Sequence, residues 1–161
     1  TGKTFIGSSC LIKDNSTIGT EGYDFEIDSK GRPIHTPHIG EIRIGDNVWI
    51  GSNATIESPF IKTTLIGNNV KIDDLVQIGS EAIVQKNSLI TAGVILSNNV
   101  VIGESCVLGP NTSVREYVVI ENNVQTGIGA VVIRNLEKDG IYVGNPSRLL
   151  RNRGESIGGQ E

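Results

Sequence analysis

A six-residue rhythm of branched aliphatic side chains dominates the chain from Ile66 to Val132. A period of six fits neither an α-helix, with 3.6 residues per turn, nor a strand, whose side chains alternate. Repeats of six residues are typical of a parallel β-helix, in which three short strands form each triangular coil of about 18 residues. Thr126 alone interrupts the aliphatic series, whose members are Ile66, Ile72, Ile78, Val84, Ile90, Leu96, Ile102, Leu108, Val114, Ile120, Thr126 and Val132.

The residues between the aliphatic positions repeat as well. Gly often follows the aliphatic residue, and Asn or Asp comes two or three places after it, as at Asn69 and Asn87. Both Gly and Asn tolerate the left-handed backbone conformation, so we expect corners there. Four places after the aliphatic residue lies a small or β-branched side chain, which predicts a second inward position. Cys106 occupies such a position, so we interpret it as core and not as a nucleophile.

Two segments break the rhythm. Residues 19–43 separate an early set of repeats (Ile6, Ile12, Ile18) from the rest and contain both histidines. Ile56 and Ile66 are ten residues apart where six would keep the register, which indicates a small insertion at 57–65. We therefore expect a β-helix over 1–134, and a C-terminal extension with a flexible tail over 135–161, in which Arg148 to Arg153 could start a short helix. Long ordered loops in compact proteins are often functional.

Composition narrows the class of protein. The 161 residues suit one domain, and the net charge of −4 argues against a nucleic-acid partner. The two Cys are too far apart for a metal motif, and no apolar run is long enough to span a membrane. We expect a cytoplasmic protein without a metal. Because the chain contains no Met, we also expect Thr1 not to be a natural start and the sequence to be a piece of a longer protein.

The segment GYDFEIDSKGRPIHTPHIGEIRIGDNVWIGSNATIE, the ten-residue step and the following TTLIGNNVKIDDLVQIG carry a family resemblance. Together with the ending YVGNPSRLL, they resemble UDP-3-O-acylglucosamine N-acyltransferase and related hexapeptide-repeat sugar acetyltransferases. The resemblance covers about residues 19–146. It implies a left-handed parallel β-helix, an all-β fold, and a bacterial homotrimer with active sites between subunits. The family context is lipopolysaccharide or surface-polysaccharide biosynthesis.

The resemblance also implies a reaction. An acyl group passes from acyl-carrier protein, or from acetyl-CoA in relatives, to an amino sugar that is linked to a nucleotide. A His takes the proton of the attacking group, because histidine titrates near neutral pH. Backbone N–H groups at a coil corner can stabilise the oxyanion. We expect no permanently bound cofactor, only the acyl donor as co-substrate.

This sequence departs from the family at the decisive position. The family pattern L-V-Q/H-I-A-H-N-V corresponds here to LVQIGSEA, so Ser80 stands in place of the catalytic His. A second family His corresponds to Tyr117. Neither Ser nor Tyr is a base at pH 7 without unusual perturbation. The alternative to an enzyme is therefore a catalytically lapsed β-helix that serves as a binding or structural module. We favour the enzyme because both insertions are retained.

Four residues are candidates for the chemistry. His38 and His35 are the only histidines, and one of them could act as general base, with His38 preferred; the alternative is local packing in the loop. Ser80 marks the vacated position. Glu81 could act as a base if it were desolvated, or it could be a solvated corner residue.

The remaining candidates concern binding. The substrate-binding candidates are Asp73, Asp74, Gln77, Trp49 and Tyr117, and the donor-binding candidates are Gly93, Gly79 and Arg148. Asp73 and Asp74 could instead cap a corner, and Trp49 could pack between subunits. Gly93 matches a corner where the donor's pantetheine passes in the family, but it could simply be a turn glycine. Arg148 could meet donor phosphates or lie in a solvated C-terminus.

Overall fold

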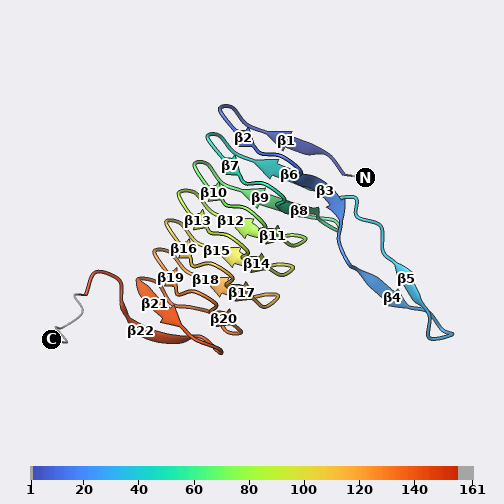
Figure 1. Cartoon of the computed structure of the whole chain (residues 1–161). Coiled ribbons are helices and arrows are strands. Elements are labelled where there is room, and N and C mark those ends of the chain that lie inside the picture. Colours follow the sequence, from blue (N-terminus) through green and yellow to red (C-terminus); the bar gives the residue numbers. More distant parts are fainter. Residues whose placement is uncertain (1, 156–161) are drawn as a thin grey trace.

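The computed structural model describes residues 2–155, and this part of the chain is an all-β stack of triangular coils (Figure 1). The strands of successive coils pair in parallel along three faces, which we name A, B and C in chain order. Face A contains β1 (Thr4–Ile6), β6 (Glu41–Ile44), β9 (Thr63–Ile66), β12 (Ile83–Val84), β15 (Val101–Ile102) and β18 (Val119–Ile120). The parallel β-helix predicted from the six-residue rhythm is confirmed.

The other two faces continue the same coils. Face B contains β2 (Leu11–Ile12), β7 (Trp49–Ile50), β10 (Lys71–Ile72), β13 (Leu89–Ile90), β16 (Val107–Leu108), β19 (Gln125–Thr126), β21 (Gly140–Val143) and β22 (Arg148–Asn152). Face C contains β3 (Thr17–Glu21), β8 (Thr55–Ser58), β11 (Gln77–Ile78), β14 (Ile95–Leu96), β17 (Ser113–Val114) and β20 (Val131–Val132). Ile72 pairs with Ile90 and Ile78 with Leu96, so one regular coil takes 18 residues.

The aliphatic rhythm forms the core of the stack. All twelve positions from Ile66 to Val132 are at most 1% exposed, and the smaller inward residues, including Cys106, are buried beside them. A single coil buries little, but stacked coils form a continuous apolar column. Ile6 and Ile12 belong to the same rhythm yet are 46% and 39% exposed, because they lie in the first coil and are covered on one side only.

Thr126 breaks the aliphatic series for a reason that the sequence alone did not reveal. In the regular coils the Gly after each strand donates its N–H to a backbone carbonyl of the next coil, as Gly103 does to Ile120. Gly109 instead donates to the Thr126 hydroxyl, at 2.9 Å. Thr126 also shares a hydrogen bond of 2.8 Å with the buried Thr112. A side-chain hydroxyl thus accepts the hydrogen bond that a backbone carbonyl accepts in the regular coils.

The predicted corners contain left-handed residues. Asn47, Asn53, Asn69, Asn87, Asn99, Asn111 and Asn123 all have positive φ, as their sequence positions predicted. At three other corners the left-handed residue is Leu75, Glu81 or Tyr117, for which this conformation costs about 1–2 kcal/mol. The Asp73–Asp74 corner thus turns at Leu75 and not at an aspartate.

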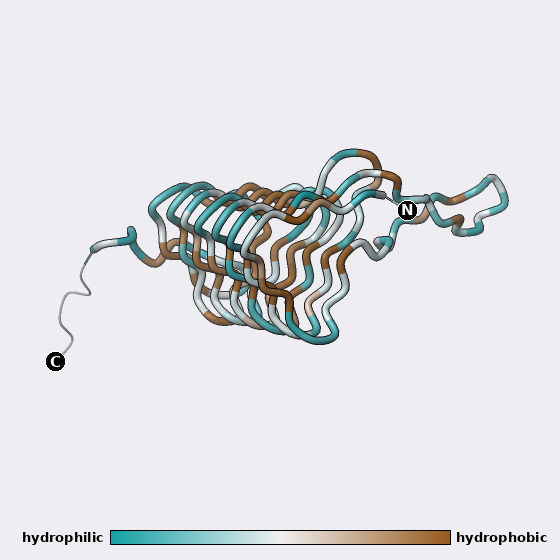
Figure 2. The backbone as a smooth tube through the Cα atoms, turned by 90° about the horizontal axis from the view of Figure 1, so that it is seen from above, coloured by the Kyte–Doolittle hydropathy of each residue, from teal (hydrophilic) through white to brown (hydrophobic). Residues whose placement is uncertain are grey.

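The long insertion leaves the stack as an arm. Its tip is the antiparallel hairpin of β4 (Phe25–Ile27) and β5 (Pro33–His35), which extends away from the coils between faces C and A (Figures 1 and 2). The arm returns at Gly40, where backbone N–H groups bond to the short insertion. Residues 19–21 and 41–43 lie in coil strands, so the arm itself starts at Gly22 and ends at Gly40.

The C-terminal end differs from the expectation in one respect. The short helix expected from Arg148 to Arg153 is wrong: Arg148–Asn152 form β22, antiparallel to β21. β21 itself pairs in parallel with β19, so face B continues past residue 134. The expected flexible tail falls largely on residues 156–161, outside the described part. Residues 2–155 contain no helix long and apolar enough to cross a membrane.

Candidate functional site

A cavity of about 620 Å³ lies where the arm leaves the stack, at the corner between faces C and A. Its walls are the arm, the short insertion, and the corners of three successive coils. Five carboxylates line it, against the single ammonium of Lys62. They are Asp24, Glu26, Glu57, Glu81 and Glu116. The acidic lining favours a ligand with positive charge.

The base of the arm is a cluster of rings. His35 and His38 stack with a centroid distance of 6.1 Å, and Phe25 and Phe60 contact them edge-on. His35 is partly exposed, and its Nδ1 lies 3.7 Å from the Glu21 carboxylate. His38 is completely buried. The two candidate histidines therefore lie together, and only His38 is enclosed between the arm and the coils.

Hydrogen bonding fixes the tautomer of His38. Its Nδ1 is 2.5 Å from the Ser58 carbonyl oxygen, and because a carbonyl can only accept, Nδ1 carries the proton. The Gly22 N–H, 3.4 Å from the same nitrogen, cannot also donate to it. Nε2 is left with its lone pair and makes no hydrogen bond, although it is buried. The nearest charged atom is Asp24 Oδ2 at 3.3 Å, which forms an ion pair with Nε2 when this nitrogen is protonated.

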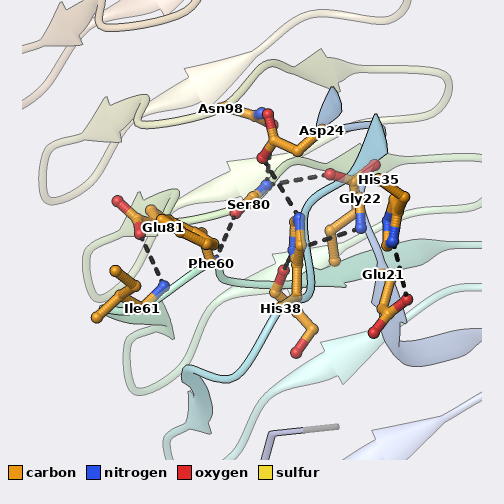
Figure 3. Close-up of polar contacts among 12 residues, drawn as sticks. Glu21, Gly22, Asp24, His35, His38, Phe60, Ile61, Ser80, Glu81 and Asn98 are labelled. Atoms are coloured by element: carbon orange, nitrogen blue, oxygen red, sulfur yellow. Dashed lines mark hydrogen bonds and ion pairs between the residues drawn. The ribbon is translucent and has the colours of Figure 1, made fainter. Parts of the chain in front are cut away.

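Figure 3 shows Asp24 joined to His38 by this contact, with Ser80, at the vacated His position, in the same close-up. The Asp24 side chain is 41% exposed and lines the cavity. A proton that arrives at Asp24 from the cavity thus has an open acceptor, the His38 lone pair, directly behind it. The arrangement is a histidine–carboxylate pair whose carboxylate contacts the cavity.

Ser80 has a structural role in this conformation. Its side chain is 2% exposed, and its hydroxyl accepts a hydrogen bond from the Phe60 N–H at 3.2 Å. Its own N–H is shared between Glu57 Oε2 at 3.2 Å and Asn98 Oδ1 at 3.1 Å. The corner N–H is therefore already occupied and not free to stabilise an oxyanion.

Glu81 does not fit the role of a base. Its carboxylate accepts hydrogen bonds from the Ile61 and Lys62 N–H groups, both at 3.3 Å, and pairs with the Lys62 ammonium at 3.3 Å. Burial raises the pKa of Glu81, but the backbone N–H groups of Lys62 and Ile61 and the Lys62 charge together outweigh it, so the pKa lies below its ordinary value. A carboxylate held in its charged form by these contacts anchors the short insertion.

Three more of the predicted residues line the same cavity: Gln77, Gly79 and Tyr117. Tyr117 is 72% exposed, and it keeps a left-handed backbone at a corner where Asn would be less strained. Glu81, two coils earlier in the stack, also has a left-handed backbone at a corner. Strained residues persist most often at functional sites. Two of them on one cavity wall mark this edge of the stack as the candidate site.

The remaining predicted residues lie elsewhere. Trp49 and Asp73 line a separate groove of about 460 Å³ on face B, where the Lys13 ammonium lies 5.3 Å from the Trp49 ring centroid. Asp74 caps a corner by accepting the Ser52 N–H at 2.7 Å. Gly93 is a left-handed corner residue, and Arg148 is exposed on β22. Within one chain the structure does not bring these residues to the arm cavity.

Two residues of the cavity were missed by the sequence reasoning. Asp24 gave no signal because one acidic residue in a charged loop is unremarkable. Glu57 directly follows an inward Ile, and only the ten-residue step that begins there could have directed attention to it. Gly22 was missed as well: a Cβ at this position would lie 2.8 Å from Glu57 Oε2 and 2.9 Å from His38 Cε1.

No three His, Cys, Asp or Glu side chains among residues 2–155 come together in a group that could hold a metal ion. The cavity lining consists mainly of carboxylates, the amide side chains of Gln77, Asn98 and Asn99, several hydroxyls and the Lys62 ammonium.

Comparison with known proteins follows this geometry. Residues 41–74 match the family model described as the hexapeptide repeat of succinyl-transferase. Over 94 residues the chain is 40% identical to a UDP-3-O-acylglucosamine N-acyltransferase of Coxiella burnetii (strain Dugway 5J108-111), covering 57% of this chain and 28% of that protein. A UDP-3-O-acylglucosamine N-acyltransferase 1 of Francisella tularensis subsp. tularensis (strain SCHU S4 / Schu 4) is 42% identical over 89 residues, 55% of this chain and 26% of that protein. The chain thus spans little more than a quarter of these relatives.

A solved structure shares the fold over nearly the whole chain. The UDP-N-acetylglucosamine O-acyltransferase of Moraxella catarrhalis RH4 superposes with a TM-score of 0.76 at 19% identity, covering 95% of this chain and 65% of that one. The coils and the matched repeats define a hexapeptide-repeat protein. Within that class, the chain resembles the acyltransferases, and in sequence specifically the UDP-3-O-acylglucosamine N-acyltransferases.

Proposed function

We propose that this chain is an acyltransferase that moves an acyl group from a thioester donor to the amino group of a sugar nucleotide. The observation that carries the proposal is the buried His38 whose unbonded Nε2 faces Asp24 on the wall of an acidic cavity. The donor is acetyl-CoA or acyl-carrier protein. Sequence similarity to amino-sugar acyltransferases supports the choice of acceptor, and an acetyltransferase domain of similar fold that was solved with acetyl coenzyme A supports a thioester donor.

The proposed reaction begins with a protonated amine at Asp24. The ammonium gives its proton to Asp24, which passes it to His38 Nε2, so that the imidazolium and the Asp24 carboxylate form an ion pair. The free amine then attacks the thioester carbonyl and forms the C–N bond. When the tetrahedral intermediate collapses, the C–S bond breaks, and the leaving thiolate takes the second proton from the nitrogen, which becomes the amide. The His38 imidazolium then returns the first proton through Asp24 to solvent. Deprotonation of this kind contributes roughly 10²- to 10⁴-fold to a rate.

We further propose that the active molecule is a homotrimer. Outward-facing apolar side chains on face B support this, since Trp49 and Leu89 are 41% and 42% exposed on one flat face. Burial of such a face between subunits is favourable. The groove beside Trp49 would then be completed by a neighbouring subunit.

The second candidate is a binding module without catalysis. It is favoured by one observation: Ser80 stands at the position of the family's catalytic His, and its N–H is already engaged by Glu57 and Asn98. A module of this kind would bind amino-sugar nucleotides and release no thiol.

The test is thiol release from acyl-CoA with a set of UDP-linked amino sugars, for the parent chain and the variants His38→Asn and His35→Asn. The amide nitrogen of Asn can replace the Nδ1–H that bonds to Ser58, whereas the proton-accepting Nε2 is lost. We expect His38→Asn to lower the rate about 100-fold or more, and His35→Asn to change it little.

Urea denaturation separates a chemical role of His38 from a structural one, because loss of folding would lower the rate only in proportion to the unfolded fraction. Absence of turnover with every amino sugar and with both donor types would refute the enzyme and leave the binding module. An unchanged rate in folded His38→Asn would refute the role of the histidine.

A further inference from the structure

Glu57 reaches the corner at Ser80, the position that the family resemblance assigns to the catalytic His. Its Oε2 accepts the Ser80 N–H at 3.2 Å, and its Oε1 accepts Gln77 Nε2 at 3.0 Å. The short insertion places it there, because the chain leaves face C directly after β8. Glu57 therefore stands at the reacting corner although it belongs to the coil before Ser80.

The Glu57 carboxylate is buried and lacks a cation. Its residue is 8% exposed, and within residues 2–155 it forms no ion pair with Lys, Arg or His. The one ammonium of the cavity, Lys62, is held by Glu81. A buried charge is costly unless it is paired, and two neutral hydrogen-bond donors compensate only part of that cost. The carboxylate thus gains most from a cation that enters the cavity.

The approach of the arm brings Glu57 close to the histidine pair. Gly22 lies between them, and a Cβ there would be within 3.0 Å of both Glu57 Oε2 and His38 Cε1. Asp24 lines the same cavity two residues further along the arm. Two carboxylates, Glu57 and Asp24, thus line this part of the cavity, with the buried His38 behind Asp24.

We infer that Glu57 is the specificity-determining residue of this site: its carboxylate binds the ammonium of the acceptor sugar and selects amines over hydroxyls. A primary ammonium supplies a positive charge and three N–H donors, whereas a hydroxyl supplies one neutral donor. The inference rests on the proposed function for the identity of the site. It differs from that proposal in assigning the selection of the acceptor to Glu57 and not to His38 or Asp24.

The experiment measures binding by isothermal titration calorimetry, with no acyl donor present. The ligands are UDP-glucosamine and UDP-glucose, which differ by amine and hydroxyl at one position. The proteins are the parent chain, Glu57→Gln, and Glu137→Gln as a control for the loss of one carboxylate, because Glu137 is exposed and lies outside the cavity lining. Gln keeps an oxygen that can accept the Ser80 N–H.

We expect the parent to bind UDP-glucosamine about 10- to 100-fold more tightly than UDP-glucose. Glu57→Gln should remove that preference and leave the affinity for UDP-glucose unchanged, which also shows that the cavity remains folded. Glu137→Gln should retain the preference. A preference that persists in Glu57→Gln, or a parent that shows none or binds neither sugar, would overturn the inference.

Failure of the inference and failure of the proposed function give different results. A preference that depends on Glu57 but is accompanied by no thiol release in any assay supports the inference and refutes the acyltransferase. Turnover whose selectivity for amines is unaffected by Glu57→Gln supports the acyltransferase and refutes the inference.

Discussion

The substitution Gly22→Ala tests the site through the addition of one methyl group. The new Cβ would lie 2.8 Å from Glu57 Oε2 and 2.9 Å from His38 Cε1, whereas ordinary contacts begin at 3.4 Å. Glu57 and His38 must therefore each move by about half an ångström. Catalytic groups need to be held within about that distance of their productive positions. Displacements approaching 1 Å cost about 100-fold in rate, so we expect kcat/KM for thiol release to fall by about 10- to 100-fold.

The accompanying loss of stability should be modest. Overpacking costs about 1–3 kcal/mol, and the coil core is untouched because Gly22 lies at the base of the arm. Chemical denaturation gives the free energy of unfolding, and Lys30→Ala at the arm tip is the control. If Gly22→Ala keeps full activity, the close packing of Glu57 and His38 is not part of the mechanism. If activity falls only in proportion to the unfolded fraction, the effect is one of folding.

Three further predictions concern stability, each measured by urea denaturation. Glu81→Gln should lower the free energy of unfolding at pH 7 by about 1–2 kcal/mol. Because folding lowers the pKa of Glu81 from 4.5, the charged carboxylate stabilises the fold above that pH, and this stabilisation is lost as the pH falls through the folded pKa. The difference in stability between parent and variant should therefore narrow in acid, and a difference that stays constant with pH would refute this cause. Thr126→Val should cost about 1–3 kcal/mol by removing the acceptor of the Gly109 N–H; no loss would mean that this N–H returns to a backbone carbonyl. Tyr117→Asn should stabilise by about 1 kcal/mol through relief of its left-handed backbone, and a loss of stability would contradict that reasoning.

The β-helix could be predicted because the same packing requirement repeats at every sixth residue. Each inward position faces the same narrow interior, so one rule explains Ile66, Val132 and every repeat between them. The same rule identified Cys106 as core. Corners were predictable where Asn marks them, but not at Leu75, because nothing in its type announces a left-handed backbone.

The site was less predictable because it depends on contacts between segments that the repeat does not relate. Asp24 meets His38 only because the arm folds back on itself, and Glu57 reaches Ser80 across 23 residues. The sequence did locate the two breaks in the rhythm, and both border the cavity. It could not specify which side chains the breaks bring together. Glu81 illustrates the limit: the sequence left open a base or a solvated corner residue, and neither interpretation included the contacts with the short insertion that hold its carboxylate.

The central claim is that this cavity catalyses transfer of an acyl group to an amine. The most direct measurement is mass spectrometry of the sugar nucleotide after incubation with a thioester donor and the parent chain, with His38→Asn as the matched control. We predict a mass gain of one acyl group with the parent and a much smaller yield with His38→Asn. Because the product is an amide, the added mass should resist mild base and hydroxylamine. An unmodified amino sugar, or an acyl ester formed equally by both proteins, would contradict it.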